Sequence, residues 1–252
     1  MRNQIEYISN VNGLKYISHL NKSRSIFSNF FYINPKKQYE KKETETFSKL
    51  FKKGMTFLDV GAQTGYYSLL AHSLGAKIVF SFEPDINSLK ILKSNISLNN
   101  LNHKTIIFQK ALYDITTKAH IKSTRMKLIP SDKRFILKET DKNNIKKKSE
   151  NFIRTSAEVF DKLKNTSLKT KIDFVKMDIE GAELNALKGM KKMLKRYKPK
   201  LLISIHPQKM LSFKTNPSEI YFLLNSIGYK NSRVTEINKK LNINENYVDL
   251  FH

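Results

Sequence analysis

The chain has 252 residues, a formal net charge of +24 and no cysteine. Its length suits one large α/β domain or two small ones, and a chain of this size buries a large core without covalent cross-links. The absence of cysteine excludes disulfides, thiolate nucleophiles, cysteine-ligated zinc and iron–sulfur clusters.

The predicted elements begin with residues 1–38, which hold short apolar stretches such as 7–8 and 26–33 and are expected to form a strand-rich N-terminal cap. Residues 39–252 are expected to form the main domain. A charged stretch at 39–51 carries apolar side chains at helical spacing and predicts a helix. Strands are then predicted at 56–60, 77–82, 105–112, 152–155, 172–177, 200–205, 234–238 and 247–251, and helices at 64–73, 86–98, 157–163, 182–197 and 217–227. This alternation predicts a mostly parallel sheet covered by helices on both faces, with an antiparallel hairpin at the C-terminal end.

The segment 118–150 interrupts the alternation. It is polar, with eleven Lys or Arg residues against four Asp or Glu, and it predicts a hairpin or a long surface loop. The basic charge of the whole chain has two interpretations. One is a polyanionic partner, such as nucleic acid or an anionic membrane surface. The other is a lysine-rich composition without a function, which is favoured because the lysines are spread along the chain without clustered arginine.

The first candidate site is the loop from Asp59 to Gly65, which follows a predicted strand and leads into a predicted helix. Its spacing is acidic-x-Gly-x-x-x-Gly, whereas a dinucleotide site reads Gly-x-Gly-x-x-Gly. An acidic residue at the strand end would repel a pyrophosphate and suits a cation, such as the amino group of a methionyl ligand. Gly61 and Gly65 would let the backbone turn beside that ligand. An ordinary strand–turn–helix connection is the alternative.

Glu83 ends the next predicted strand, eighteen residues after Gly65. An acidic residue at about this distance from the loop accepts hydrogen bonds from ribose hydroxyls in nucleotide-binding folds. A solvated glutamate at a strand end is the alternative. Together, the loop and Glu83 indicate a nucleoside site that does not bind a pyrophosphate, and S-adenosylmethionine (SAM) fits that description.

Two further strand ends carry polar side chains. Lys176 and Asp178 share one face of the strand predicted at 172–177, and Glu180 and Glu183 lead into the next helix, where acidic residues also favour the helix dipole. His206 ends the strand predicted at 200–205. Because open parallel sheets bind ligands at the carboxyl ends of their strands, Asp178 and His206 are expected to lie at one edge with Asp59 and Glu83.

These motifs resemble the FkbM-type family of class I SAM-dependent methyltransferases. The resemblance rests on the Asp-Val-Gly-Ala loop at 59–62, Glu83-Pro84, the Ala-Leu-x-Asp turn that ends at Asp114, and the Lys-x-Asp-x-Glu-Gly-x-Glu pattern at 176–183. It implies a Rossmann-like fold with a seven-stranded sheet and methylation of a hydroxyl on a saccharide or other small metabolite. It also implies SAM binding by Gly61, Gly65 and Glu83, a place for Asp114 near the adenine or the methionine, and a place for Asp178 facing the methyl transfer. One departure is Ser204, where family members often carry glutamate.

The reaction predicted from these residues is methyl transfer to a hydroxyl, which needs a base to remove a proton. His206 or Asp178 is the candidate for that base. A metal ion is the alternative way to acidify the hydroxyl, and Asp178 and Glu180 are oxygen ligands of the kind that Mg²⁺ prefers. No metal is expected, since the sequence has no zinc-type histidine spacing.

Two other functions stay open at this stage. The charge of +24 favours an RNA or other nucleic-acid methyltransferase. The serine at position 204 leaves room for an inactive SAM-binding scaffold. The N-terminus lacks the apolar stretch of a signal peptide, and no window approaches the ~20 apolar residues of a membrane span, so a cytoplasmic protein is expected.

Overall fold

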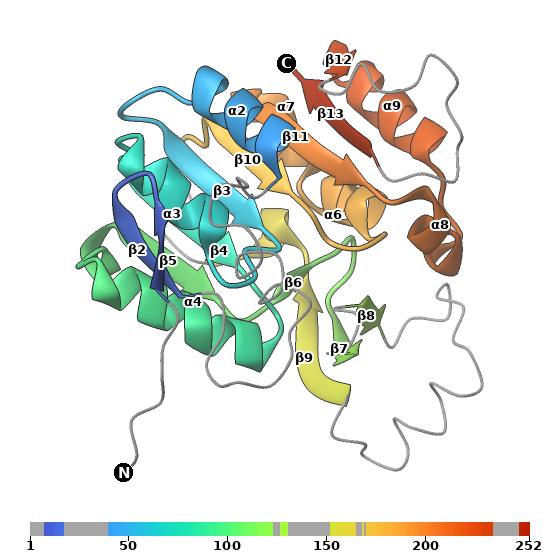
Figure 1. Ribbon diagram of the computed structural model, residues 1–252. Helices are drawn as coiled ribbons and strands as arrows, with labels where there is room; N and C mark the ends of the chain where they lie inside the picture. The colour runs from blue at the N-terminus through green and yellow to red at the C-terminus, as the bar shows by residue number, and fades with distance from the viewer. Residues whose placement is uncertain are drawn as a thin grey trace.

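The computed structural model describes residues 8–17, 40–122, 127–130, 152–164, 168, 170–233 and 247–252. Its centre is a seven-stranded sheet in the order β12-β13-β11-β10-β3-β4-β5 (Figure 1). The five parallel strands are β3 (Thr56–Val60), β4 (Ile78–Phe82), β5 (Thr105–Phe108), β10 (Phe174–Met177) and β11 (Lys200–Ile205). β13 (Tyr247–Phe251) lies antiparallel between β11 and β12 (Asn231–Arg233). The predicted fold class, a seven-stranded and mostly parallel sheet with a C-terminal antiparallel pair, is confirmed.

Helices cover both faces of this sheet. Successive side chains of a strand point to opposite faces, so the buried strands contribute apolar side chains to a cluster on each side. Phe57 of β3 packs with the cluster of α2 (Lys41–Leu50), α3 (Tyr66–Ser73) and α4 (Ile86–Leu98). Its neighbour Leu58 packs with the cluster of α6 (Glu183–Gly189), α7 (Lys191–Tyr197) and α9 (Pro217–Ser226). All five residues of β3 are buried, as expected for a central parallel strand covered on both sides.

The helix starts carry local signals that fix where they begin. Asp85 caps α4 by accepting a hydrogen bond from the Ser88 amide at 2.9 Å. Asn216 and Glu219 form a capping box at the start of α9, with proline at the first helical position. These signals place the two helix starts where the sequence predicts them.

Two predicted elements are divided in the structure. The strand predicted at 105–112 ends at Phe108, and Ala111–Leu112 forms β6 in a second sheet. The helix predicted at 182–197 is broken after Gly189 into α6 and α7. A Cβ at Gly189 would overlap the carbonyl oxygen of Tyr113. Gly189, the last residue of α6, thus packs tightly against the turn that follows β6. Both predictions missed a contact between distant segments, which periodicity does not record.

The second sheet has the order β6-β9-β7-β8 and lies beside the carboxyl end of the main sheet (Figure 1). Its longer strands are β7 (Thr117–Lys122), β8 (Lys127–Pro130) and β9 (Phe152–Glu158). β7 and β8 pair antiparallel, so the start of the basic segment follows the hairpin, one of the two predicted alternatives. Most of the segment after it lies outside the described residues. β9 runs past the predicted strand 152–155, so the helix predicted at 157–163 is a single turn at Phe160–Lys162.

The remaining described elements flank this frame. β1 (Ile8–Val11) and β2 (Leu14–Ile17) form a hairpin that is fastened to α4 by two hydrogen bonds between Asn99 and the backbone of Lys15, at 2.9 and 2.7 Å. Short turns of helix are Asn102–Lys104, α8 (Pro207–Met210) and Leu211–Phe213. The stretches predicted at 26–33 and 234–238 lie outside the described residues, and the domain boundary at 38 stays a prediction. Among the described helices, none is both long enough and apolar enough to cross a bilayer.

Candidate active site

A cavity of about 250 Å³ opens at the carboxyl ends of β3, β4, β10 and β11. β3 connects onward to β4 on one side and has β10 on the other, so the cavity lies at the topological switch point of the sheet, where open α/β folds bind ligands. Six of the predicted site residues line it: Asp59, Gly61, Glu83, Asp178, Glu180 and His206. The expectation that Asp59, Glu83, Asp178 and His206 lie at one edge of the sheet is confirmed.

Two predicted residues lie elsewhere. Gly65 is the N-cap residue of α3, and its φ of 92° lies in the left-handed region that favours glycine. A Cβ there would also meet the end of the Leu92 side chain of α4. Asp114 follows β6, and its Cα lies close to Gly189 of α6, 3.4 Å from where a Cβ of that residue would be. Neither is among the residues that line the cavity, and their cofactor-binding roles stay predictions. An apolar wall formed by Leu112, Ile121 and Leu128 of the second sheet lines the cavity instead.

Gly61 forms the floor of the cavity between β3 and the end of β10. Its φ of 83° lies in the left-handed region, and its amide donates to the carbonyl of Phe82 at 3.0 Å. A Cβ at this position would overlap the carbonyl oxygen of Asp178. The loop therefore needs glycine both for its backbone conformation and for the close approach of β10.

Asp59 is buried beside this loop. Its carboxylate accepts a hydrogen bond from the Ser68 hydroxyl at 2.6 Å. Burial raises the pKa of the Asp59 carboxyl to about 6, against the opposing effects of the Lys176 charge and the Ser68 hydrogen bond. Near neutral pH, Asp59 is an anion in a site that favours a cationic partner.

Glu83 is buried directly after β4, where it hydrogen-bonds the loop that follows β3 and the turn that begins α4. Its carboxylate oxygens accept hydrogen bonds from the amides of Gln63 at 2.8 Å and Asp85 at 2.7 Å. Burial raises the pKa of the Glu83 carboxyl to about 8, although these two hydrogen bonds oppose the rise. A ligand that donates hydrogen bonds to the ionised carboxylate would offset part of the cost of its burial.

The free energy of unfolding of the ligand-free protein is expected to fall as the pH rises from 5 to 9. The pKa of Glu83 is about 8 in the folded chain against its ordinary value of 4.5 in the unfolded chain. The contribution of the neutral group to stability is therefore fully present below pH 4.5 and is lost as the pH rises through about 8. A difference of this size corresponds to an upper limit of about 3–5 kcal/mol. Urea denaturation at a series of pH values checks it. In Glu83→Gln, which stays neutral, the fall should be much smaller, and parallel curves for the two proteins would refute the assignment.

Lys176 lies at the centre of a group of carboxylates. Its ammonium group is 3.3 Å from Asp178 and 4.5 Å from the centroid of the Tyr67 ring. The Tyr67 hydroxyl donates to Glu40 at 2.8 Å, which brings a third carboxylate toward the lysine besides Asp178 and Asp59. Burial lowers the pKa of Lys176, but the charges of Asp178, Glu40 and Asp59 outweigh it and hold the lysine protonated. Sequence reasoning placed Lys176 and Asp178 on one face and missed Glu40 and Tyr67.

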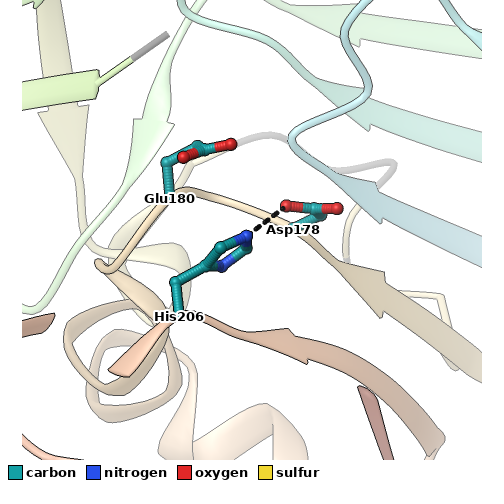
Figure 2. A group of neighbouring side chains, drawn as sticks. All are labelled: Asp178, Glu180 and His206. Atoms are coloured by element: carbon teal, nitrogen blue, oxygen red, sulfur yellow. Dashed lines mark ion pairs between the residues drawn. The ribbon is translucent and has the colours of Figure 1, made fainter. Parts of the chain in front are cut away.

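His206 and Asp178 point toward each other across the ends of β11 and β10 (Figure 2). The Nε2 atom of His206 is 3.6 Å from the nearer Asp178 oxygen, and its Nδ1 atom is 2.9 Å from Oε1 of Glu183. Burial lowers the pKa of His206, but the hydrogen bond and charge of Glu183 and the charge of Asp178 outweigh it, so the pKa is raised above 6.5. Glu183 also accepts from the Gly181 amide at 2.9 Å, so the predicted helix-capping role is combined with a contact to His206.

Asp178 is held as a carboxylate. Burial raises the pKa of its carboxyl, but the charges of Lys176 and His206 and the hydrogen bonds from Lys176 and Ser204 outweigh it and keep the pKa below its usual value. Ser204, the departure from the family pattern, therefore supports the carboxylate of Asp178. A carboxylate with a lowered pKa is a weak base.

The side chains of Asp178, Glu180 and His206 bring one potential metal-binding atom each within 4.8 Å of one another (Figure 2). Each carboxylate already has an ammonium partner, because Lys176 pairs with Asp178 and Lys209 pairs with Glu180. A divalent cation would have to displace both ammonium groups or share the carboxylates with them. The charges present in the site thus disfavour the magnesium site considered from the sequence.

Residues 59–230 match the family model of the methyltransferase FkbM domain. Among solved structures, the chain is similar to a methyltransferase FkbM from Methylobacillus flagellatus KT, with 18% identity and a TM-score of 0.52. The match covers 80% of this chain and 44% of that one, so the chain spans less than half the length of that relative. Its level of identity supports a shared fold.

Two further structures match at lower scores. The Streptococcus mutans protein SMU.1697c, solved in complex with SAH, has 11% identity and a TM-score of 0.48, and the match covers 85% of this chain and 97% of that one. The M. jannaschii protein TYW2, solved in complex with AdoMet, has 12% identity and a TM-score of 0.49, with 100% and 86% covered. No curated protein sequence matches the chain.

Proposed function

Because this chain belongs to the FkbM methyltransferase family, we propose that it transfers the methyl group of SAM to a hydroxyl group of a saccharide or another small metabolite. The observation that carries the proposal is that one cavity joins two sets of residues. Asp59, Gly61 and Glu83 form the first set, Asp178 and His206 form the second, and all five line the same cavity. The first set suits a nucleoside with an amino acid attached, and the second suits proton removal from an acceptor.

The residues of the first set fit SAM chemically. Glu83, when ionised, offers a carboxylate to the ribose hydroxyls, and Asp59 offers a buried anion to the α-ammonium group. Gly61 keeps the floor clear where any side chain would overlap the chain behind it. When bound, SAM supplies an electrophilic methyl group on a sulfonium.

The second set supplies the base. His206 is the better candidate of the two named from the sequence, because Asp178 is held ionised by Lys176 and Ser204 at a lowered pKa. Nε2 of His206 accepts the hydroxyl proton as the oxygen–carbon bond forms and the carbon–sulfur bond of the sulfonium breaks. The imidazolium that results lies between the carboxylates of Glu183 and Asp178, which stabilise its charge.

The experiment that tests the proposal is incubation of the protein with SAM labelled in the methyl group and a cell extract separated into glycan, small-molecule, lipid, RNA and protein fractions. We expect alkali-stable label in the glycan or small-molecule fraction, since methyl ethers resist alkali and methyl esters do not. Label in RNA, with an affinity that falls steeply with salt, would instead favour the nucleic-acid methyltransferase suggested by the charge of +24. No label in any fraction, with SAM bound, would favour an inactive scaffold.

Removal of divalent ions is expected to leave turnover unchanged. The carboxylates of Asp178 and Glu180 are paired with Lys176 and Lys209, and the base proposed here needs no metal to acidify the hydroxyl. The measurement is label transfer after dialysis against EDTA, compared with the same protein after Mg²⁺ or Mn²⁺ is added back. Activity that EDTA abolishes and Mg²⁺ restores would show that a metal acts at this site.

A further inference from the structure

We infer that Glu183 is a positioning residue that holds His206 in the tautomer and orientation that a base requires. The inference rests on the proposed function, because it assigns a task to Glu183 within that reaction. It concerns the side chain that lies behind His206, on the far side of the ring from Asp178. From the sequence alone, the role considered for Glu183 was that of an acidic residue at a helix start.

The geometry determines which nitrogen carries the proton. Oε1 of Glu183 is 2.9 Å from Nδ1 of His206 and also accepts a hydrogen bond from the Gly181 amide at 2.9 Å, so this oxygen is an acceptor. Nδ1 must therefore be the N–H of the neutral ring, which leaves the lone pair on Nε2. Nε2 is the atom on the side of Asp178, in the wall of the cavity. The Glu183 contact thus presents the basic nitrogen to the acceptor.

The burial of Glu183 argues against a role in helix capping alone. The side chain is 0% exposed, and within the described part of the chain its Oε2 atom has no hydrogen-bond partner. A buried carboxylate with an unsatisfied oxygen is costly, whereas a neutral serine or asparagine can satisfy the amide at a helix start at lower cost. The carboxylate is useful, however, next to a histidine that becomes positively charged during the reaction.

The backbone that delivers Glu183 is also strained. Glu180 has a φ of 60°, which is uncommon for a residue with a side chain. This turn connects the end of β10 to α6, so that Asp178 and Glu183 approach His206 from opposite sides. Local strain of this kind persists only where the surrounding contacts hold it, and here it brings both carboxylates to one ring.

The test compares wild-type protein with Glu183→Gln, and uses Glu219→Gln as the matched control, since Glu219 takes part in a helix-start capping box and does not line the cavity. The first readout is the ¹⁵N spectrum of the histidine side chains, in which the tautomer of each ring is resolved. The chain has six histidines, and the signals of His206 are identified by their loss in His206→Asn. This readout needs no acceptor and no turnover.

We expect wild-type His206 to be the Nδ1–H tautomer when neutral, and Glu183→Gln to mix the two tautomers, because an amide both accepts and donates. With the extract fraction that takes up label, kcat of Glu183→Gln should fall about 10²–10⁴-fold, while KM for SAM stays within about threefold. Glu219→Gln should match wild type in both readouts.

An Nε2–H tautomer in the wild-type protein would overturn the inference even if Glu183→Gln failed to fold. An unchanged kcat in a folded Glu183→Gln would overturn it as well. The two proposals fail separately: absence of methyl transfer by wild type refutes the proposed function, whereas normal transfer with an Nε2–H ring refutes only the role of Glu183.

Discussion

Replacement of His206 with asparagine is expected to lower kcat for methyl transfer about 10²–10⁴-fold, the usual contribution of a general base. The loss should fall on kcat, because His206 lies at the end of β11 and the residues proposed to hold SAM lie at the ends of β3 and β4. Asparagine keeps a polar side chain of similar size at the same place, and it cannot take up a proton near neutral pH.

The measurement is label transfer under saturating SAM, together with the affinity for S-adenosylhomocysteine (SAH) determined by calorimetry. His72→Asn is the matched control, because His72 is a partly buried histidine that hydrogen-bonds Thr105 at 2.8 Å and does not line the cavity. If His206→Asn kept full turnover while Asp178→Asn lost it, Asp178 would be the base and our choice between the two candidates would be wrong.

Gly61→Ala is expected to destabilise the protein strongly and to abolish SAH binding. A left-handed φ alone costs a residue with a Cβ about 1–2 kcal/mol. At Gly61 the new Cβ would also overlap the carbonyl oxygen of Asp178, so the ends of β3 and β10 must move apart. We therefore expect a total loss of about 3 kcal/mol or more in the free energy of unfolding, and a distorted floor beneath the cofactor.

Gly54→Ala separates the two causes. Gly54 has a φ of 87°, close to the 83° of Gly61, but nothing lies within 4 Å of a Cβ built on it. Urea denaturation of both variants should show a cost about 1–2 kcal/mol at Gly54 and a clearly larger one at Gly61, and SAH affinity should be unchanged in Gly54→Ala. Equal costs and equal SAH affinities would mean that the close approach at Gly61 does not matter.

Much of the fold was predictable because its strands carry strong local signals. The bounds of β3, β11, β13 and α4 agree with the predicted ranges, since each is a continuous apolar or periodic stretch with a clear start. The division at 105–112 was missed, because there the chain leaves the main sheet and enters the second one. The division at 182–197 was also missed, and it falls where Gly189 packs against the Tyr113 carbonyl. Such contacts join residues far apart in the sequence.

The candidate site shows the same limit. Asp59, Glu83, Asp178 and His206 were predicted to converge because the carboxyl ends of parallel strands share one edge, and they do line one cavity. Glu40 was missed, since nothing in its local sequence relates it to Tyr67, whose hydroxyl donates to it. The contact between Glu183 and His206 joins residues 23 positions apart, and it could be inferred only after α6 was placed beside the end of β11.

The central claim is that the cavity binds SAM through Asp59, Gly61 and Glu83. The most direct test is calorimetric titration of the wild-type protein and Glu83→Ala with SAH above pH 8, where Glu83 is ionised. We predict one SAH per chain for wild type, and an affinity lower by about 10²–10⁴-fold in Glu83→Ala, because two hydrogen bonds from ribose to a carboxylate contribute about 1.5–3 kcal/mol each. A wild-type protein that binds no SAH, or a Glu83→Ala variant that binds it equally well, would contradict the account.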